Sequence, residues 1–331
     1  MAYLLALWRL NMSRFFVWFA LVASLFISPF IGAVTLHVAD ICDLSTLHSQ
    51  IFFELRLPRV MFAFFAGAIL SISGLLFQTL FRNALMTPYT LGVSGGAVLG
   101  AGIAIKLGLG ALIFGISAIN IFGFLGAILT VFLLLYLNRF IKNAKSESLL
   151  LLGIALSLFY TSALMIIFYL GSAIQNDMLI RFTMGSLSII GWQNPLFIGF
   201  VGSALVTVVY LYRFELQLLA TSDESAKLKG LHSKKITYLL LLISSFAVGT
   251  LVSISGPIGF IGLITPHIIS MLYPSSISSR VLKTALFGAL FLVFCDTIAR
   301  LLSTQNDLPI GIVTALIGGP FFIYLIIRKK Q

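Results

Sequence analysis

Charged side chains are scarce in this sequence. Asp, Glu, Lys and Arg make up 9% of its 331 residues, whereas 60% of the residues are hydrophobic. Soluble globular domains carry about 25% charged residues, so the composition excludes a water-soluble enzyme or a soluble binding protein of this length. Because one helical crossing of a bilayer takes about 20 residues, the chain has room for roughly ten crossings. Residues 1–331 are therefore interpreted as a single transmembrane domain.

Catalytic motifs and cysteine pairs are also missing. The sequence has no Walker A pattern, no H-E-x-x-H, no nucleophile elbow and no dinucleotide fingerprint. The two cysteines, Cys42 and Cys295, show no metal-ligand spacing, and we do not expect a disulfide between them. His37 and His48 flank two aspartates, which we interpret as solvated surface rather than a metal site. The chain is expected not to be an enzyme and to hold no cofactor or metal itself.

Long apolar windows predict an all-α polytopic membrane protein with about ten transmembrane helices. The third and eighth helices are short and rich in glycine or proline, which makes them the weakest members of the set. The expected helices cover residues 15–36, 57–81, 90–105, 109–137, 148–172, 194–212, 234–254, 257–273, 281–303 and 309–327.

Basic residues are unevenly distributed between the two sides of these helices. Cytoplasmic segments of bacterial membrane proteins carry an excess of Lys and Arg. With the N-terminus in the cytoplasm, 16 of the 21 basic residues lie on that side, and both termini are cytoplasmic. The net charge of +11 therefore reflects topology in the bacterial inner membrane and not contact with nucleic acid. The five external basic residues are Arg56, Arg59, Lys106, Arg181 and Arg300.

Three stretches resemble one family, the FecCD-type permeases for iron siderophores and vitamin B12. They run from Leu55 to Ala101, from Ser255 to Leu272 and from Phe294 to Ile326, in the order and spacing that the family shows. The resemblance implies the type II architecture of ABC importers, with a second permease subunit that is either a copy or a paralogue. It also implies two ATPase subunits that use ATP and Mg²⁺, and an extracytoplasmic substrate-binding protein.

Three external arginines are candidates for docking that binding protein. Arg56 and Arg59 bracket Pro58 at the outer start of the second helix, and we expect both guanidinium groups to face outside. Arg300 follows Asp296 by one turn, so it is the expected partner of that carboxylate within the membrane. The resemblance implies that Arg56, Arg59 and Arg300 receive acidic residues of the binding protein. The alternatives are interfacial snorkelling of the first pair and an internal ion pair that orients helices.

The longest cytoplasmic segment, residues 213–235, contains the sequence LATSDESAKLKGL. It resembles the coupling element through which such importers contact their ATPases, with Gly230 placed to end a short helix. A solvated charged loop is the alternative. The residues implied in coupling are Ser222, Glu224, Ala226, Leu228 and Gly230.

The pathway through the membrane is expected to be apolar and rich in glycine. Asn83 and Ser146 are candidate gate residues, and Gly95 and Gly96 are candidate lining residues, although close helix packing explains such glycines equally well. Near the end of the eighth helix, Pro266 is expected to leave free carbonyl groups that His267 could reach.

The expected function is import of a metal chelate by alternating access, with ferric siderophore as the favoured cargo. Vitamin B12, haem or an oxyanion such as molybdate are the alternatives within the family. A secondary transporter driven by an ion gradient is the alternative from another class. That class needs ion ligands near the middle of the membrane, where Asp296 is the single candidate.

Overall fold

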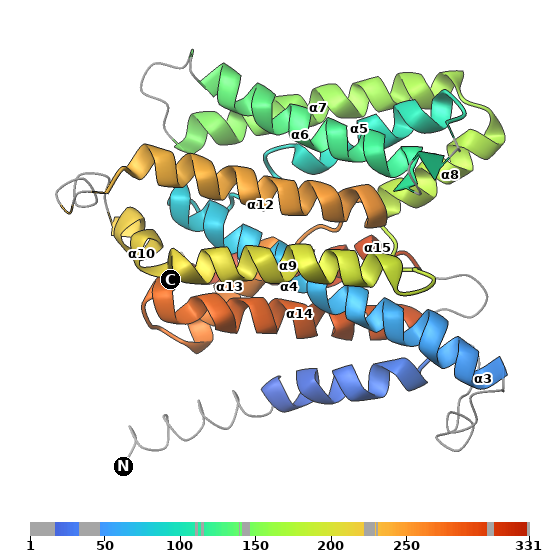
Figure 1. Cartoon of the computed structure of the whole chain (residues 1–331). Helices are drawn as coiled ribbons and strands as arrows, with labels where there is room; N and C mark the ends of the chain where they lie inside the picture. The colour runs from blue at the N-terminus through green and yellow to red at the C-terminus, as the bar shows by residue number, and fades with distance from the viewer. Residues whose placement is uncertain are drawn as a thin grey trace.

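The computed structural model of the chain describes residues 17–32, 47–109, 112–113, 116–138, 140, 146–221, 229, 231–302 and 308–329. These residues form a bundle of helices that run roughly along one direction, from the end that holds α10 to the end that holds α3 and α8 (Figure 1). The one strand pair in the described part is a small antiparallel ladder, β1 (Leu112–Ile113) and β2 (Ile116–Ser117), between α5 and α6.

Ten apolar helices lie in the described part of the chain, in agreement with the number predicted from the sequence. Six are long enough to cross a bilayer and four are shorter. The long ones are Leu47–Leu80, Ala118–Leu137, Ser148–Leu170, Gln193–Leu211, Lys235–Ser255 and Ile277–Leu302. The shorter ones are Val17–Phe30, Val93–Lys106, Ile261–Leu272 and Ile310–Tyr324.

Figure 1 labels most of these helices. The labelled helices are α3 (Leu47–Gln50), α4 (Leu57–Leu80), α5 (Val93–Lys106), α6 (Ala118–Asn138), α7 (Ser146–Leu170), α8 (Ala173–Met184), α9 (Gln193–Leu211), α10 (Arg213–Thr221), α12 (Ser233–Ser255), α13 (Ile261–Leu272), α14 (Ile277–Leu302) and α15 (Ile310–Lys329). A π-helical turn, η2 (Ile51–Arg56), joins α3 to α4, and a 3-10 turn, η1 (Ser28–Phe30), ends the first described helix.

Several helix boundaries differ from the sequence-based prediction. The helix expected from residue 109 begins at Ala118, after the β1–β2 ladder. The segment between α7 and α9, predicted to be external, holds an additional helix, α8, which is too polar for a search based on hydrophobic windows. Its start carries a readable signal, because the Ser172 hydroxyl accepts from Gln175 N and the Gln175 side chain accepts from Ser172 N.

The central helix of the bundle is α4, whose long span is the most buried of the six. It packs on α14 where Gly67 meets Gly288, and on α13 where Gly74 meets Gly262. A Cβ atom on Gly67 would overlap the Gly288 carbonyl, so the two backbones are in direct contact. Water gives no hydrophobic drive between helices inside lipid, and close backbone contact of this kind replaces it.

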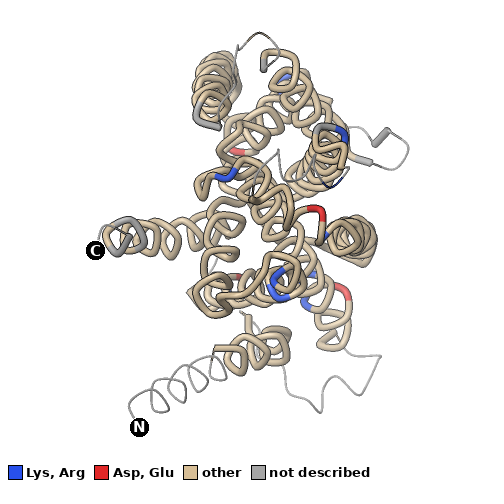
Figure 2. Tube along the Cα trace, turned by 90° about the vertical axis from the view of Figure 1, so that its left-hand side faces the viewer, with Lys and Arg blue, Asp and Glu red and all other residues tan. Residues whose placement is uncertain are grey.

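The two ends of the bundle carry different basic residues. Arg59 and Asp296 meet at one end, where α4 begins and α14 ends. Arg82 and Arg280 line a shared pocket at the other end, where α4 ends and α14 begins. Figure 2 looks at the bundle from the α10 end, and most of the trace is free of charged residues. Arg59 thus lies at the opposite end from Arg82 and Arg280, in agreement with the separation of basic residues predicted from the sequence.

The Gly67 contact yields a direct test of helix packing. We expect Gly67→Ala to lower the free energy of unfolding by about 1–3 kcal/mol, because the added methyl group pushes α4 and α14 apart. Unfolding of the purified protein in detergent measures it. Gly319→Ala is the matched control, because no atom beyond the neighbouring backbone of its own helix lies within 4 Å of the added Cβ, and its effect should stay within about 0.5 kcal/mol. Equal effects of the two changes would contradict the packing argument.

Candidate functional site

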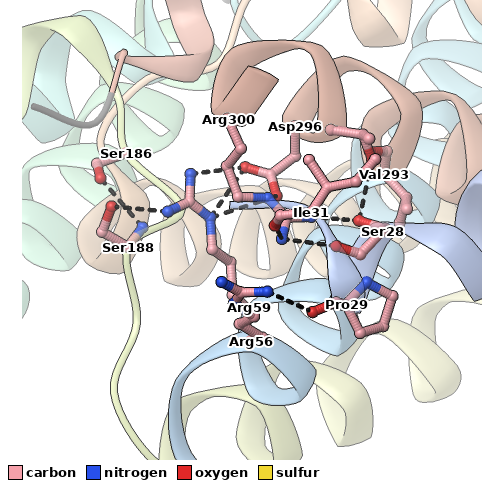
Figure 3. Close-up of polar contacts among 11 residues, drawn as sticks. Ser28, Pro29, Ile31, Arg56, Arg59, Ser186, Ser188, Val293, Asp296 and Arg300 are labelled. Atoms are coloured by element: carbon pink, nitrogen blue, oxygen red, sulfur yellow. Dashed lines mark hydrogen bonds and ion pairs between the residues drawn. The ribbon is translucent and has the colours of Figure 1, made fainter. Parts of the chain in front are cut away.

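A buried carboxylate organises one end of the bundle. Asp296 of α14 is 0% exposed, and its Oδ1 accepts hydrogen bonds from Arg59 Nε at 3.1 Å and Arg59 Nη2 at 2.9 Å. Arg300 Nε lies 3.1 Å from Oδ2, one turn further along the same helix. One carboxylate is thus clamped between two guanidinium groups from two helices (Figure 3). The predicted pairing of Arg300 with Asp296 is confirmed, and Arg59 is a partner that sequence spacing alone did not reveal.

Arg300 also ties α14 to the N-terminal helix. Its Nη1 donates to the carbonyl oxygens of Ser28 at 2.8 Å and Ile31 at 2.9 Å, and its Nη2 donates to the Ser28 hydroxyl. Thr297 Oγ1 donates to the same hydroxyl at 2.9 Å. The last carbonyls of a helix have no partner within the helix and carry partial negative charge, so a guanidinium group stabilises them well.

Arg56 completes the cap on η1. Its Nη1 lies 3.2 Å from the carbonyl oxygen of Pro29 and 2.9 Å from that of Phe30. Gly32 leaves the space for this guanidinium group, because a Cβ at that position would lie 2.9 Å from Arg56 Nη2. The carbonyls from Ser28 to Ile31 are therefore shared between two arginines of different helices.

The segment between α8 and α9 joins the same end. Arg59 Nη1 lies 3.4 Å from Ser188 Oγ (Figure 3). Gly191 N donates to the Glu54 carbonyl at 2.8 Å, and Trp192 Nε1 donates to the Phe53 carbonyl at 3.0 Å. Both acceptors lie in the π-helical turn η2, whose wider winding alters the usual pattern of carbonyl bonding in a helix. The π turn thus provides acceptors for a neighbouring segment.

The exposure expected for Arg56 and Arg59 is wrong. They are 8% and 9% exposed, so both guanidinium groups are buried, as is that of Arg300 at 7%. The physical reason is Asp296 and the η1 carbonyls, which would be costly to bury without donors. The three arginines and one carboxylate still leave a net charge of +2 just beneath the surface. Docking of a binding protein at this end stays a prediction.

The opposite end holds a pocket of about 280 Å³ between α4, α10, α13 and α14. Pro266 in α13 has no N–H, so the Gly262 carbonyl four residues earlier has no helical donor. Gln78 Nε2 of α4 donates to this carbonyl at 3.3 Å and to that of Leu263 at 3.2 Å. The freed Gly262 carbonyl is bonded by Gln78, and His267 lines the pocket. A bond from His267 to a freed carbonyl stays a prediction.

The candidate gate and lining residues lie on several elements. Asn83 follows α4 and lines this pocket, and its Oδ1 accepts from Leu85 N at 3.0 Å. Ser146 begins α7. In α5, Gly96 packs against Thr130 and Gly126 of α6, whereas Gly95 faces Tyr160 of α7. The described contacts of both glycines are therefore contacts between helices, and their role in a pathway stays a prediction.

Within the coupling element, residues 219–221, 229 and 231 are described. Ser222, Glu224, Ala226, Leu228 and Gly230 lie outside the described residues. The preceding helix, α10, is anchored to the start of α14 because Gln217 Oε1 accepts from Ile277 N at 2.6 Å. A movement of α10 would therefore act directly on α14.

Metal-ligating and thiol side chains are few in the part of the chain that the structure describes. No group of three His, Cys, Asp or Glu side chains there lies close enough to hold a metal ion. Cys295 is a buried free thiol, and Cys42, like His37, lies outside the described residues.

Comparison with known proteins identifies this arrangement. A profile of the FecCD transport family matches residues 20–328. The chain belongs to the FecCD transport family. A relative from Helicobacter pylori with the name "Probable iron chelatin transport system permease protein" is 37% identical over 289 residues, which are 87% of this chain and 85% of that one. The hemin transport system permease protein HmuU of Yersinia pestis is 33% identical over 91% of this chain and 90% of its own length.

Solved structures agree with the family assignment. An inward-facing conformation of a metal-chelate type ABC transporter superposes with a TM-score of 0.82 at 30% identity, covering 96% of this chain and 99% of that one. This FecCD permease is therefore a multi-pass transport subunit of the inner membrane and not an enzyme. The resemblance read from the three sequence stretches is confirmed. Other relatives are named for molybdate and for vitamin B12.

The ion cluster of this permease can be tested by removing its one carboxylate. Asp296→Asn leaves Arg59 and Arg300 buried without a counter-charge, and we expect the free energy of unfolding to fall by about 3–5 kcal/mol. Asp177→Asn is the control, because Asp177 pairs with Arg181 at 2.9 Å on the surface, with side chains 62% and 71% exposed. That pair should contribute about 0.3–0.5 kcal/mol. Similar losses of unfolding free energy at both sites would show that the buried cluster stabilises the fold no more than an exposed ion pair does.

Proposed function

We propose that this permease imports a ferric siderophore or a closely related iron chelate. The observation that supports this cargo is the relative named for iron chelatin, whose 37% identity extends over 87% of the chain. Relatives named for hemin, molybdate and vitamin B12 keep those cargoes as alternatives. All of these are taken up by one architecture, so the permease is expected to leave the choice of cargo largely to its binding protein.

A second permease subunit, a copy or a paralogue, is proposed to pack beside α7. This helix is the least buried of the six long spans. Exposed apolar side chains cover much of its circumference, including Leu151, Leu158, Phe159 and Met165. Its exposed hydroxyls, Thr161 and Ser162 among them, donate to carbonyls four residues earlier and are already satisfied. A helix of this kind suits lipid on one side and an apolar conduit, shared with a second subunit, on the other.

The energy for transport is proposed to enter through α10 and the loop that follows it. Two ATPase subunits would use ATP and Mg²⁺, since the permease has no nucleotide-binding sequence. The bond from Gln217 to the start of α14 supports this path. At the other end of α14 lie Asp296 and Arg300, so one rigid helix connects the ATPase end to the proposed docking end.

The docking end is proposed to attract an acidic binding protein by its net positive charge. Arg56, Arg59 and Arg300 are buried, so each would act from a fixed position beneath the surface. Charges across such an interface raise the rate of encounter and set the orientation of the partner. This differs from flexible surface arginines, which lose side-chain entropy on docking.

An ion-driven secondary transporter is the weaker alternative. Such a mechanism needs a carboxylate within the membrane that gives up its partner and binds the coupling ion. Asp296 is held between two arginines on the chain itself. Opening this site to an ion would leave two guanidinium groups buried without a counter-charge.

The energy source can be measured in proteoliposomes that contain the permease, its ATPase and its binding protein. We expect uptake of a ferric siderophore to stop when orthovanadate blocks the ATPase and to persist when a protonophore collapses the proton gradient. The opposite pattern would favour the secondary transporter.

Docking can be tested at Arg56, whose described partners are backbone carbonyls. We expect Arg56→Glu to weaken binding of the substrate-binding protein at least tenfold, about 1.4 kcal/mol. Affinity is measured on permease in nanodiscs, and a thermal unfolding curve shows whether each variant is folded. Arg181→Gln on α8, at the same end and exposed, should change the affinity by less than about threefold. An unchanged dissociation constant in folded Arg56→Glu would contradict docking at this end.

A further inference from the structure

The pocket at the α10 end has a charge pattern that the transport proposal does not use. Its lining includes Arg82, His267 and Arg280, and no carboxylate is among the lining residues in the part of the chain that the structure describes. Gln78, Asn83 and Ser270 add polar groups to the same wall. The described acid on α10, Glu215, is not part of the lining. A concave site with two guanidinium groups and an imidazole favours an anion.

Arg280 provides the second observation. Its Nε is buried and has no hydrogen-bond partner among the described residues of the subunit. A buried N–H without an acceptor is unfavourable, so an acceptor from outside these residues would stabilise it. Arg82 is fixed beside it, because its Nε and Nη2 donate to the Leu219 carbonyl at 3.1 and 2.8 Å. The site therefore holds the Arg82 guanidinium group in place and offers the Nε–H of Arg280 as a donor.

The pocket lies at one end of the bundle, where the headgroup layer of a bilayer is expected. The 24 residues of α4 span about 36 Å, slightly more than the hydrocarbon core, and the pocket lies where this helix ends. Cation–aromatic pairs typical of an interface surround this end. Lys283 lies 4.2 Å from the ring centre of Tyr273, and Arg213 lies 4.0 Å from that of Tyr210. Basic pockets between transmembrane helices at this level bind phosphate-bearing headgroups.

We propose that this pocket binds a phosphate group, from an anionic phospholipid headgroup or from a soluble phosphate. Arg280 Nε and the guanidinium of Arg82 would donate to its oxygens. The bound group would bridge the end of α4 and the start of α14, beside the anchor of α10 on α14. The inference concerns the folded permease alone and does not depend on which cargo is carried or on how transport is driven.

The test uses delipidated full-length permease in nanodiscs of phosphatidylcholine, with and without phosphatidylglycerol. We expect phosphatidylglycerol to raise the Tm of the wild-type protein and Arg280→Gln to lose at least half of that rise. Lys283→Gln is the matched control, since it removes one charge from the same helix but stacks on Tyr273 outside the pocket lining, and it should keep the full rise. Equal responses of the two variants would overturn the proposal.

A second arm identifies the source of the phosphate. Inorganic phosphate is titrated into phosphatidylcholine nanodiscs at constant ionic strength. Stabilisation by phosphate that requires Arg280 indicates a soluble ligand, and stabilisation by phosphatidylglycerol alone indicates a lipid. No response to either probe would overturn the proposal. Loss of ATPase association in Arg280→Gln, with unchanged lipid and phosphate responses, would also overturn it, since the pocket would then receive an acidic side chain.

A readout on the wild-type protein covers the case in which Arg280→Gln does not fold. Native mass spectrometry of protein released from equal mixtures of the two lipids should show one phosphatidylglycerol retained in preference to phosphatidylcholine. Arg280→Lys keeps the charge and should retain most of this preference. Equal retention of both lipids by the wild-type protein, together with no response to inorganic phosphate, would contradict a phosphate site.

Discussion

The structure depends on one buried carboxylate and the cations that surround it. Asp296 has no exposed surface, and it is held by Arg59 from α4 and Arg300 from its own helix. A charge within a membrane domain is tolerated when it is paired, and here the pairing also fixes which helices meet. Because Arg300 and Arg56 both bond the carbonyls of η1, the same cluster holds the N-terminal helix at this end.

Packing along the bundle is set by small residues rather than by charge. The contacts of Gly67 with Gly288 and of Gly74 with Gly262 bring α14 and α13 directly against α4. These rigid contacts connect the ion cluster at one end to the basic pocket at the other. A transporter that alternates between two conformations needs such stiff elements, so that a movement at α10 reaches the opposite side of the membrane. We therefore expect α4, α13 and α14 to move together as one rigid unit.

The sequence predicted the features that depend on composition and on local spacing. Long apolar windows gave the number of helices, and the one-turn spacing of Asp296 and Arg300 gave their pairing. It did not predict the Arg59 contact with Asp296, since these residues are 237 positions apart and are joined by tertiary packing. It also misjudged the exposure of the arginines, because hydropathy treats a guanidinium group as a surface group whatever its partners. The sequence also did not predict that Gln78 bonds the carbonyl freed by Pro266, because Gln78 and Gly262 are far apart in the chain and meet through tertiary packing.

The central claim is that Asp296 and Arg59 stabilise the fold as a pair. A double-mutant cycle on the unfolding free energy tests it directly, with Asp296→Asn, Arg59→Gln and both changes together. The account predicts that the double variant is clearly more stable than the sum of the single losses implies, with a coupling energy above about 2 kcal/mol. Losses that add within about 0.5 kcal/mol would show that the two side chains do not act together.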